Sequence, residues 1–287
     1  MNALETLKTY FGYDTFREGQ EKIVEAILTN RDVLAIMPTG AGKSICYQIP
    51  ALILPGITLV ISPLISLMQD QVKALNDAGI HAAFINSSLT ENQISKALYL
   101  AASGRYKIIY VAPERLENYE FLEFARNVEI SMVTVDESHC ISQWGQDFRP
   151  SYLKIVEFVK NLPKRPIVSA FTATATEEVK NDILCTLSLA DPEVVITGFD
   201  RKNLYYSVEN IRRKDEFIME YIEKHPTESG IIYCATRKNV DNLFELLFKR
   251  GVPVTRYHAG LTNETRKKNQ DDFIYDRTPV IIATNAF

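Results

Sequence analysis

The chain has 287 residues, of which 46% are hydrophobic and 24% charged, a balance typical of a folded globular protein. Its net charge of −4 argues against binding nucleic acid through a bulk positive field, so any nucleic-acid path must be a local groove. The apolar runs have only the length of strands, so we expect no membrane span. The four cysteines never form a C-x-x-C pair, so we expect neither a disulfide framework nor a zinc ribbon.

The first part of the chain alternates apolar runs with helical patterns. Near-continuous β-branched runs predict strands buried on both faces of a parallel sheet, at residues 32–37, 58–62, 107–111, 131–135 and 166–170. Helical patterns lie between them at residues 16–28, 67–77 and 152–161. This alternation predicts a doubly wound α/β domain.

A second series of the same kind follows the polar, glycine-containing segment 198–204. It comprises predicted strands at residues 230–234, 252–256 and 279–283 and predicted helices at residues 237–249 and 262–274. We therefore expect a first domain over residues 1–200 and a second over residues 201–287. A parallel α/β domain usually continues into a helix after its strand, so the second domain is expected to be incomplete.

Residues 37–44 read Met-Pro-Thr-Gly-Ala-Gly-Lys-Ser between a predicted strand and a helical pattern, the setting of a phosphate-binding loop. Glycines let backbone N–H groups approach phosphates, and the following helix directs its positive dipole end at them. Lys43 would reach the β- and γ-phosphates, and the Ser44 hydroxyl would ligate Mg²⁺. Met37 replaces the usual first glycine, and a chance glycine-rich turn is the alternative. The candidate nucleotide-binding residues are Met37, Pro38, Thr39, Gly40, Ala41, Gly42, Lys43 and Ser44.

An Asp-Glu pair follows the predicted strand at residues 131–135. The carboxyl ends of parallel strands face the ligand crevice, where Asp136 suits Mg²⁺ coordination and Glu137 suits positioning or deprotonating an attacking water. The alternative is the solvated start of a helix. His139 is either a structural histidine or a relay between the nucleotide and the second domain. The candidate catalytic residues are Lys43, Asp136, Glu137 and His139, with Ser44 and Asp136 as Mg²⁺ ligands.

A loop over residues 142–150 then presents Trp144, Phe148 and Arg149, and Trp144 is the only tryptophan in the chain. An aromatic ring stacked on a base contributes roughly 1–3 kcal/mol and arginine binds phosphate, so the loop suits single-stranded nucleic acid. The alternative is that Trp144 and Phe148 fill a core under the domain. Two such sites close together in the chain suggest nucleotide hydrolysis coupled to nucleic-acid contact.

With these parts assembled, the chain resembles the RecQ family of superfamily 2 DNA helicases. The likeness is carried by the phosphate loop, the acids and the aromatic-rich loop, and by residues 11–20, 62–70, 111–115, 171–176, 233–237, 257–261 and 283–287. The family has Asp-Glu-Ala-His where this chain has Asp-Glu-Ser-His, and serine is small enough to fit. The resemblance implies two tandem RecA-like doubly wound parallel-sheet domains of the α/β class, the second incomplete, which use ATP and Mg²⁺.

The resemblance also assigns individual residues. Tyr13 and Arg17 would sandwich the adenine base and Gln20 would hydrogen-bond its edge, while residues 171–176 would couple hydrolysis to movement. Contacts with DNA or the interdomain cleft are expected from Ser62, Pro63, Pro113, Arg115, Trp144, Phe148, Arg149, Thr236, Arg237, His258 and Thr284. At least one residue in each of the segments 62–70 and 111–115 is expected to serve an ordinary strand-to-helix connection instead.

The function implied is the motor core of an ATP-dependent 3′-to-5′ helicase on single-stranded or partly duplex DNA. We expect a monomer without membrane attachment, located in the cytoplasm, at the nucleoid of a bacterium or in a eukaryotic nucleus. The family's arginine-finger motif, zinc module and winged helix are not found in this sequence. We therefore expect these residues to bind Mg·ATP but to turn it over weakly, since an arginine finger contributes about 10³–10⁵ in rate. The alternatives are an RNA-directed remodelling ATPase and a nucleotide-controlled single-strand binding module.

Overall fold

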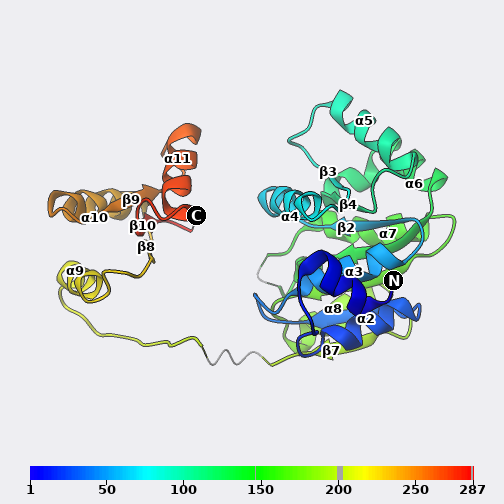
Figure 1. Ribbon diagram of the computed structural model, residues 1–287, viewed down its shortest axis with the longest axis horizontal. Helices are drawn as coiled ribbons and strands as arrows, with labels where there is room; N and C mark the ends of the chain where they lie inside the picture. Colours follow the sequence, from blue (N-terminus) through cyan, green and yellow to red (C-terminus); the bar gives the residue numbers. More distant parts are fainter. Residues whose placement is uncertain (146, 199–202, 286) are drawn as a thin grey trace. The chain divides into compact units, whose positions relative to one another are not determined.

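A computed structural model describes residues 1–145, 147–198, 203–285 and 287 (Figure 1). The chain divides into two compact units, Met1–Arg201 and Lys202–Phe287, which we call unit 1 and unit 2. The predicted boundary at residue 200 falls within 199–202, which lies outside the described residues, so its position stays a prediction.

Unit 1 is built on a parallel sheet of seven strands in the order β3-β4-β2-β5-β6-β1-β7. The strands are β1 (Val33–Ile36), β2 (Ile57–Ile61), β3 (Ala82–Ile85), β4 (Ile108–Val111), β5 (Ile130–Val135), β6 (Ile167–Thr172) and β7 (Glu193–Ile196). Every residue of β1, β2, β4 and β6 is buried, as expected for strands covered on both faces. The five predicted strands are confirmed, and the structure adds β3 and β7 at the two edges of the sheet.

Helices cover both faces of this sheet, so unit 1 is the predicted doubly wound α/β domain (Figure 1). The main helices are α2 (Gln20–Leu28), α3 (Lys43–Ile53), α4 (Ile65–Asp77), α5 (Glu91–Ala102), α6 (Tyr119–Asn127), α7 (Lys154–Lys160) and α8 (Glu177–Thr186). Buried residues of α2 to α4, such as Tyr47 and Met68, belong to one core cluster. Those of α5 to α8, such as Phe121 and Ile183, belong to another.

The helix predicted over residues 16–28 begins only at Gln20. Gly19, just before it, has a φ of 79°, a left-handed conformation through which a right-handed helix does not continue. The Arg17 backbone N–H donates to Gln20 Oε1 at 2.9 Å rather than into a helical turn. Residues 18 and 19 form a turn that the Gln20 N–H closes by donating to the Arg17 carbonyl at 3.1 Å.

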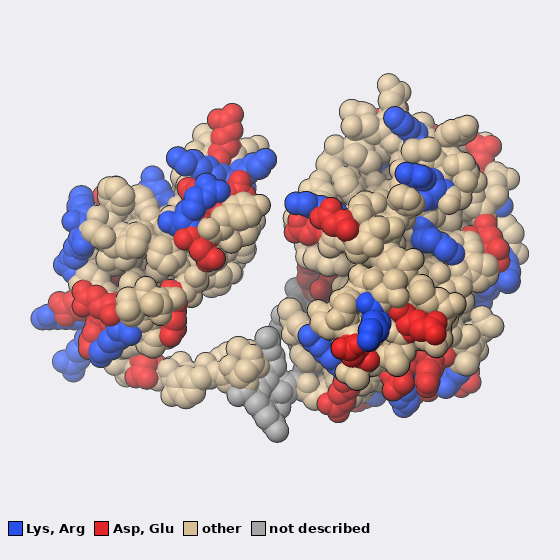
Figure 2. Space-filling view, in the orientation of Figure 1, with Lys and Arg blue, Asp and Glu red and all other residues tan. Residues whose placement is uncertain are grey.

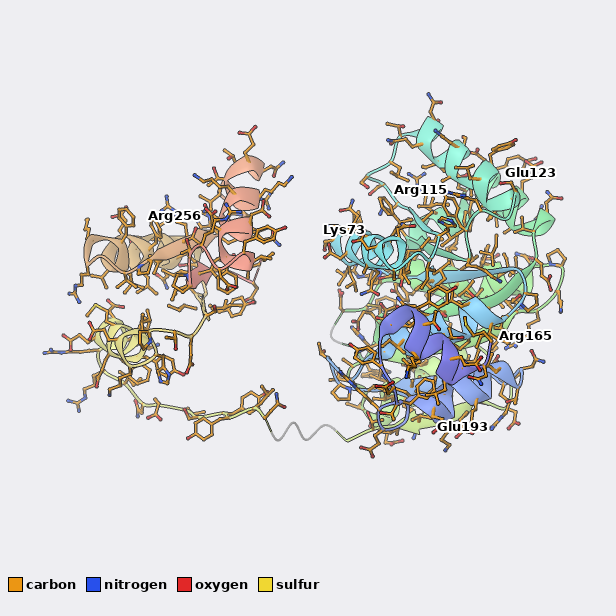
Figure 3. The ribbon with its side chains drawn as sticks, viewed as in Figure 1. Lys73, Arg115, Glu123, Arg165, Glu193 and Arg256 are labelled. Carbon is orange, nitrogen blue, oxygen red and sulfur yellow. The ribbon has the colours of Figure 1, made fainter. Side chains whose placement is uncertain are left out.

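A buried carboxylate ties the start of β1 to two other segments of unit 1. Asp32 is 2% exposed, and its oxygens accept the backbone N–H groups of Val168 at 2.9 Å and Ala190 at 2.7 Å. The Arg165 guanidinium adds a bond from Nη1 at 3.1 Å and balances the charge (Figure 3). One side chain therefore accepts from four donor atoms in three segments, namely β6, the turn before it and the segment before β7.

We expect Asp32→Ala to lower the free energy of unfolding of unit 1 by about 2–4 kcal/mol, because buried donors lose their acceptor and Arg165 loses its counter-charge. Urea denaturation followed by circular dichroism measures the change. Asp77→Ala, at the exposed end of α4, is the matched control and should stay near the wild-type value. Equal stabilities of the two variants would contradict the structural role given to Asp32.

Unit 2 is built on a second parallel sheet, with the strand order β8-β10-β9. Its elements are α9 (Lys214–Lys224), β8 (Gly230–Tyr233), α10 (Arg237–Lys249), β9 (Val254–Tyr257), α11 (Asn263–Ile274) and β10 (Val280–Ala283). The central strand β10 is buried throughout and packs with Val240 and Leu247 of α10. Strand β9 begins later than predicted, after Pro253, which has no N–H to donate to a strand ladder.

The surface of both units mixes charges of both signs. On the face shown in Figure 2, Lys and Arg side chains alternate with Asp and Glu side chains. This pattern agrees with the small net charge and with the expectation of a local nucleic-acid groove. In the part of the chain that the structure describes, no helix is both long and apolar enough to cross a membrane.

Candidate functional site

The residues predicted to bind phosphate form the turn between β1 and α3. Gly40 and Gly42 have φ values of 84° and 81°, left-handed conformations that glycine adopts without a steric penalty. Lys43 is the first residue of α3, so the free N–H groups and positive dipole end of the helix face the turn. Met37 is buried, and it anchors the turn through its backbone N–H, which donates to the Thr172 carbonyl at 3.0 Å.

The Lys43 side chain folds back into this turn. Its Nζ donates to the Met37 carbonyl at 3.1 Å. A phosphate oxygen would be a stronger acceptor than this neutral carbonyl, because hydrogen bonds between charged partners are about twice as strong. The ammonium is therefore held in place for a phosphate by a contact that it can exchange.

Gln20 and Arg17 hold the phosphate loop from outside. Gln20 is 2% exposed, and its Nε2 donates to the carbonyls of Ala41 at 3.0 Å and Gly42 at 3.2 Å. The Arg17 guanidinium donates to another loop carbonyl at 2.8 Å and lies 5.9 Å from the centre of the Tyr13 ring. The structure thus gathers the three predicted base-binding residues beside the loop. Their contact with adenine stays a prediction, and here the Gln20 amide supports the loop itself.

Asp136 and Glu137 directly follow β5 at the carboxyl edge of the sheet. Asp136 is 7% exposed and accepts the Glu137 backbone N–H at 3.0 Å. Burial and the neighbouring Glu137 carboxylate raise the pKa of Asp136 to about 6, while the charge of Lys43 partly opposes the shift. The hydrogen bond between the Glu137 carboxylate and His139 holds the pKa of Glu137 below its ordinary value. Adjacent carboxyl groups whose pKa values are pushed apart are typical of acid–base sites.

We expect Asp136→Asn to stabilise the protein in EDTA by about 1–3 kcal/mol at pH 8, because it removes an ionised group that burial disfavours. The folded pKa of Asp136 lies above its unfolded value. The penalty is therefore full above pH 6 and disappears as the pH falls towards 4. Thermal melts of both proteins across this range test the prediction. Equal melting temperatures at pH 8 would contradict it.

His139 connects the acids with the end of β6. Its Nδ1 lies 3.0 Å from Thr172 Oγ1 and 3.3 Å from Glu137 Oε2. Contacts with the Cys140 sulfur and the Glu137 carboxylate raise the pKa of His139 to about 10. Thr172 Oγ1 in turn donates to the Thr174 carbonyl at 3.0 Å, so its lone pairs face the imidazole. Sequence reasoning missed Thr172 as an individual residue, and a relay from His139 to the second domain stays a prediction.

The aromatic-rich loop, residues 142–150, exposes Trp144. Its side chain is 77% exposed, which excludes the interpretation that it fills a core, whereas Phe148 is half-buried. Arg149 donates to Asp147 Oδ2 from Nη2 at 2.8 Å and from Nε at 3.1 Å, and its Nη1 reaches the Pro63 carbonyl at 3.4 Å. Asp147 was missed from the sequence as the partner of this guanidinium.

The other candidate DNA contacts of unit 1 follow β2 and β4. Ser62 is 1% exposed, and its Oγ has no hydrogen-bond partner among the described residues. Pro113 is buried at the start of a 3₁₀ turn, which favours its alternative role in a strand-to-helix connection. Arg115 is half-buried and donates to the Asn86 carbonyl at 3.5 Å (Figure 3). Within this group, Arg115 has the side chain best suited to a phosphate.

Three candidate residues of unit 2 lie at the ends of its strands. Thr236 follows β8 and caps α10, because its Oγ1 accepts the Asn239 N–H at 3.2 Å. Arg237 is exposed in the first turn of the same helix. Thr284 follows β10 and donates its N–H to the Tyr257 carbonyl at 3.2 Å. These positions share the carboxyl edge of the sheet, where ligands of open α/β sheets bind.

His258, the fourth candidate residue of unit 2, is buried and hydrogen-bonded within the unit. It is 4% exposed, and its Nδ1 accepts the Gly260 N–H at 3.1 Å, which places the ring proton on Nε2. Nε2 donates to Asp241 Oδ1 at 3.1 Å. Both ring nitrogens are engaged inside unit 2, where they brace His258, and its contact with DNA or the interdomain cleft stays a prediction.

Mg²⁺ would need oxygen ligands from the phosphate loop and the acids. Nowhere in residues 1–145, 147–198, 203–285 and 287 do three or more His, Cys, Asp or Glu side chains gather as a metal site. Mg²⁺ in nucleotide sites is commonly held by one or two protein ligands together with phosphate oxygens and water. The half-buried Ser44 hydroxyl and the Asp136 carboxylate, whose charge a cation would balance, fit such a shared ion.

Known protein families match both units. The DEAD/DEAH box helicase family matches residues 17–182, and the helicase conserved C-terminal domain matches residues 213–287. The first match includes the phosphate loop, the acids and the aromatic-rich loop. The second includes every candidate residue of unit 2.

Relatives match along nearly the whole chain. The ATP-dependent DNA helicase RecQ of Bacillus subtilis is 47% identical over 286 residues, which cover 99% of this chain and 48% of that protein. The RecQ helicase of Haemophilus influenzae is 43% identical over 285 residues, or 99% of this chain and 46% of that protein. A putative ATP-dependent RNA helicase of Acanthamoeba polyphaga mimivirus is 40% identical over 98% of this chain and 51% of its own length. The chain thus spans about half the length of these relatives.

Solved structures match as well. The Mycobacterium smegmatis helicase Lhr bound to ssDNA and AMP-PNP has a TM-score of 0.69 at 18% identity, over 98% of this chain and 41% of that one. Saccharomyces cerevisiae Dbp5 bound to RNA and ADP BeF3 has a TM-score of 0.69 at 20% identity, over 99% and 74%. These identities establish the fold alone, and it is the predicted tandem pair of RecA-like α/β domains.

Proposed function

This chain belongs to the DEAD/DEAH box helicases and, within them, to the RecQ family of DNA helicases, and on this premise we propose that it is a motor core coupling Mg·ATP hydrolysis to single-stranded DNA. Unwinding with 3′-to-5′ polarity and the use of Mg²⁺ are parts of the proposal that rest on the family resemblance. The substrate is single-stranded or partly duplex DNA.

In the proposed reaction, the phosphate loop holds the nucleotide and the acids act on water. Lys43 and the N–H groups at the start of α3 bind the β- and γ-phosphates, and Ser44 with Asp136 would hold Mg²⁺. The ion, when bound, neutralises charge that develops on the phosphate oxygens. Glu137 orients the attacking water, and its low pKa keeps it ionised at neutral pH. His139 fixes the Glu137 carboxylate from the side facing Thr172.

The proposal that DNA contact is coupled to hydrolysis rests on one short turn, Ser138–Ile141, which contacts both the nucleotide site and the aromatic-rich loop. On the nucleotide side, His139 contacts Glu137 and Thr172. At the next residue, the Cys140 carbonyl accepts the Arg149 backbone N–H at 2.9 Å, which closes the aromatic-rich loop onto the same turn. A change in the loop on binding DNA would therefore reach the residue that positions the catalytic carboxylate.

An RNA-directed ATPase on the same scaffold is the second candidate, and one of the relatives at 40% identity is named as a putative RNA helicase. The two functions differ in the nucleic acid that stimulates hydrolysis. We expect single-stranded DNA to act at a concentration at least about tenfold lower than RNA of the same length and sequence, measured by phosphate release under Mg·ATP saturation. Equal or better stimulation by RNA would favour the alternative.

A further inference from the structure

Ser142 lies at the base of the aromatic-rich loop and uses all its polar groups there. It is 1% exposed. Its N–H donates to the His139 carbonyl at 3.2 Å, and its carbonyl accepts the Gly145 N–H at 3.0 Å. Its hydroxyl donates to Asp182 Oδ2 at 2.6 Å and accepts the Trp144 backbone N–H at 3.2 Å. The Asp182 carboxylate and the Trp144 backbone are thus joined through one oxygen atom.

The direction of these two bonds follows from the chemistry of the groups. A serine hydroxyl has one proton and two lone pairs, whereas an ionised carboxylate only accepts. Asp182 therefore accepts the one hydrogen bond that the Ser142 hydroxyl can donate, and a lone pair of Ser142 is left to accept the Trp144 N–H. The 2.6 Å separation is the short distance typical of a hydroxyl bonded to a carboxylate. Without the carboxylate, the hydroxyl could rotate and its bond to the Trp144 N–H would lose its fixed geometry.

Asp182 itself is held on a rigid element. It lies on α8, between Val179 and Ile183, which are 4% and 0% exposed and pack into the core of unit 1. The helix is capped at its start by Thr176, whose Oγ1 accepts the Val179 N–H at 3.3 Å. The carboxylate is therefore a fixed point to which a loop forty residues earlier in the chain is attached.

On its other side, Trp144 borders open space. A cavity of about 360 Å³ separates it from α8 and the segment before it, and Trp144, Gly145, Thr174 and Val179 are among the residues lining this space. Because the indole is mostly exposed and borders a cavity, core packing does not fix its position. Among the described residues, the hydrogen bonds at Ser142 are thus contacts that help to set how Trp144 is presented.

We propose that Asp182 is a positioning residue for Trp144, because it fixes the Ser142 hydroxyl and so holds the Trp144 backbone in place before DNA arrives. The proposal rests on the proposed function of this loop as a DNA contact. A loop that is ordered for only a fraction of the time binds with its affinity reduced by that fraction. Loss of Asp182 should therefore raise the DNA concentration needed for stimulation, while the rate at saturating DNA stays close to wild type.

The test compares Asp182→Ala, Asp182→Asn, Ser142→Ala and the double variant Asp182→Ala/Ser142→Ala in this chain. Glu177→Gln is the matched control, since it removes an exposed carboxylate from the same helix. The first readout is the DNA concentration giving half-maximal ATP hydrolysis, together with the maximal rate. The second is the fluorescence anisotropy and acrylamide quenching of Trp144, the only tryptophan, without DNA.

We expect Asp182→Ala and Ser142→Ala each to raise the half-maximal DNA concentration about tenfold, as for loss of a charged hydrogen bond, with the maximal rate within about twofold. Asp182→Asn keeps an acceptor and should lie between wild type and Asp182→Ala. The double variant should be no worse than either single variant, because both break the same connection. Effects no larger than those of Glu177→Gln, or single effects that multiply in the double variant, would overturn the proposal.

The fluorescence readout separates this proposal from the proposed function. If the wild-type chain shows no stimulation by DNA, the motor function fails, but the role of Asp182 is still decided by Trp144. Lower anisotropy and stronger quenching in Asp182→Ala, absent in Glu177→Gln, would support the positioning role. Identical Trp144 signals in both variants, with equal melting temperatures, would overturn it whatever the hydrolysis rates are.

Discussion

ATP hydrolysis should fall by about 10²–10³-fold when Lys43 is replaced by alanine, because the site loses the cation that stabilises charge on the transferred phosphate. Lys43 begins α3, and its Nζ rests on the Met37 carbonyl inside the phosphate loop. Alanine is a strong helix former, so α3 itself should remain intact. Single-turnover hydrolysis of labelled ATP, with protein in excess and Mg²⁺ present, measures the loss even where turnover is slow.

Lys160→Ala is the control for this experiment. Lys160 is an exposed lysine at the end of α7, outside the phosphate loop and the acids. Its substitution removes the same charge from unit 1 and should leave hydrolysis within about twofold of the wild type, as is usual for surface changes. A Lys43→Ala protein that keeps more than about a tenth of the wild-type rate would remove the phosphate loop from the proposed mechanism.

Trp144→Ala should remove most of the stimulation of hydrolysis at the single-stranded DNA concentration that gives half-maximal stimulation of the wild type, while hydrolysis without DNA continues. Stacking of an aromatic side chain on a base contributes roughly 1–3 kcal/mol, so the affinity for single-stranded DNA should fall by about 5- to 150-fold. The Trp144 side chain is 77% exposed, so its removal should not change the free energy of unfolding measurably. A DNA titration of the hydrolysis rate and a urea melt of the same protein give both values.

Tyr99→Ala provides the matched control for the tryptophan. Tyr99 lies on α5 of unit 1 and is 75% exposed, so the control removes another exposed aromatic ring of the same unit. It should change neither stability nor the response to DNA. If Trp144→Ala destabilises unit 1 strongly and Tyr99→Ala does not, the loop has a packing role that its exposure does not reveal.

The features that the sequence predicts well are those in which the chemistry depends on neighbouring residues. The continuous apolar runs of β2, β4 and β6 indicate strands that are buried on both faces of the sheet. The Gly-Lys-Ser sequence predicts a strand-to-helix turn that binds phosphate. Helix α10 was predicted at its observed bounds, because Thr236 gives a clear N-cap before an amphipathic pattern. Aromatic residues in a polar loop likewise predicted an exposed position for Trp144, which the structure confirms.

Edge strands and helix starts were predicted less well. Strands β3 and β7 are only partly buried, and neither has the β-branched run of a central strand, since β3 reads Ala-Ala-Phe-Ile and β7 begins with a glutamate. The helix predicted over residues 152–161 is reduced to α7, because Pro150 opens a separate 3₁₀ turn through Leu153 before it. In both cases the deciding factor is local burial or backbone geometry, which hydrophobic periodicity does not encode.

Contacts between distant segments could not be predicted at all. Asp182 and Asp32 each look like an ordinary acid in the sequence, yet one fixes Ser142 and the other joins Val168 to Ala190. The partner of each carboxylate depends on the order of strands in the sheet, which brings together residues that are far apart in the chain. The same limit applies to His258, whose burial against Asp241 follows from the packing of unit 2.

The most direct test of coupling is the rate of ATP hydrolysis by this chain as a function of single-stranded DNA concentration, with DNA binding followed in the same samples by the anisotropy of a labelled oligonucleotide. We predict that hydrolysis rises by about tenfold or more and that the two curves share one midpoint. The reason is that the turn Ser138–Ile141 contacts both Glu137 and Arg149. DNA that binds fully while the rate of hydrolysis stays unchanged would contradict the proposed motor and favour a nucleotide-controlled binding module.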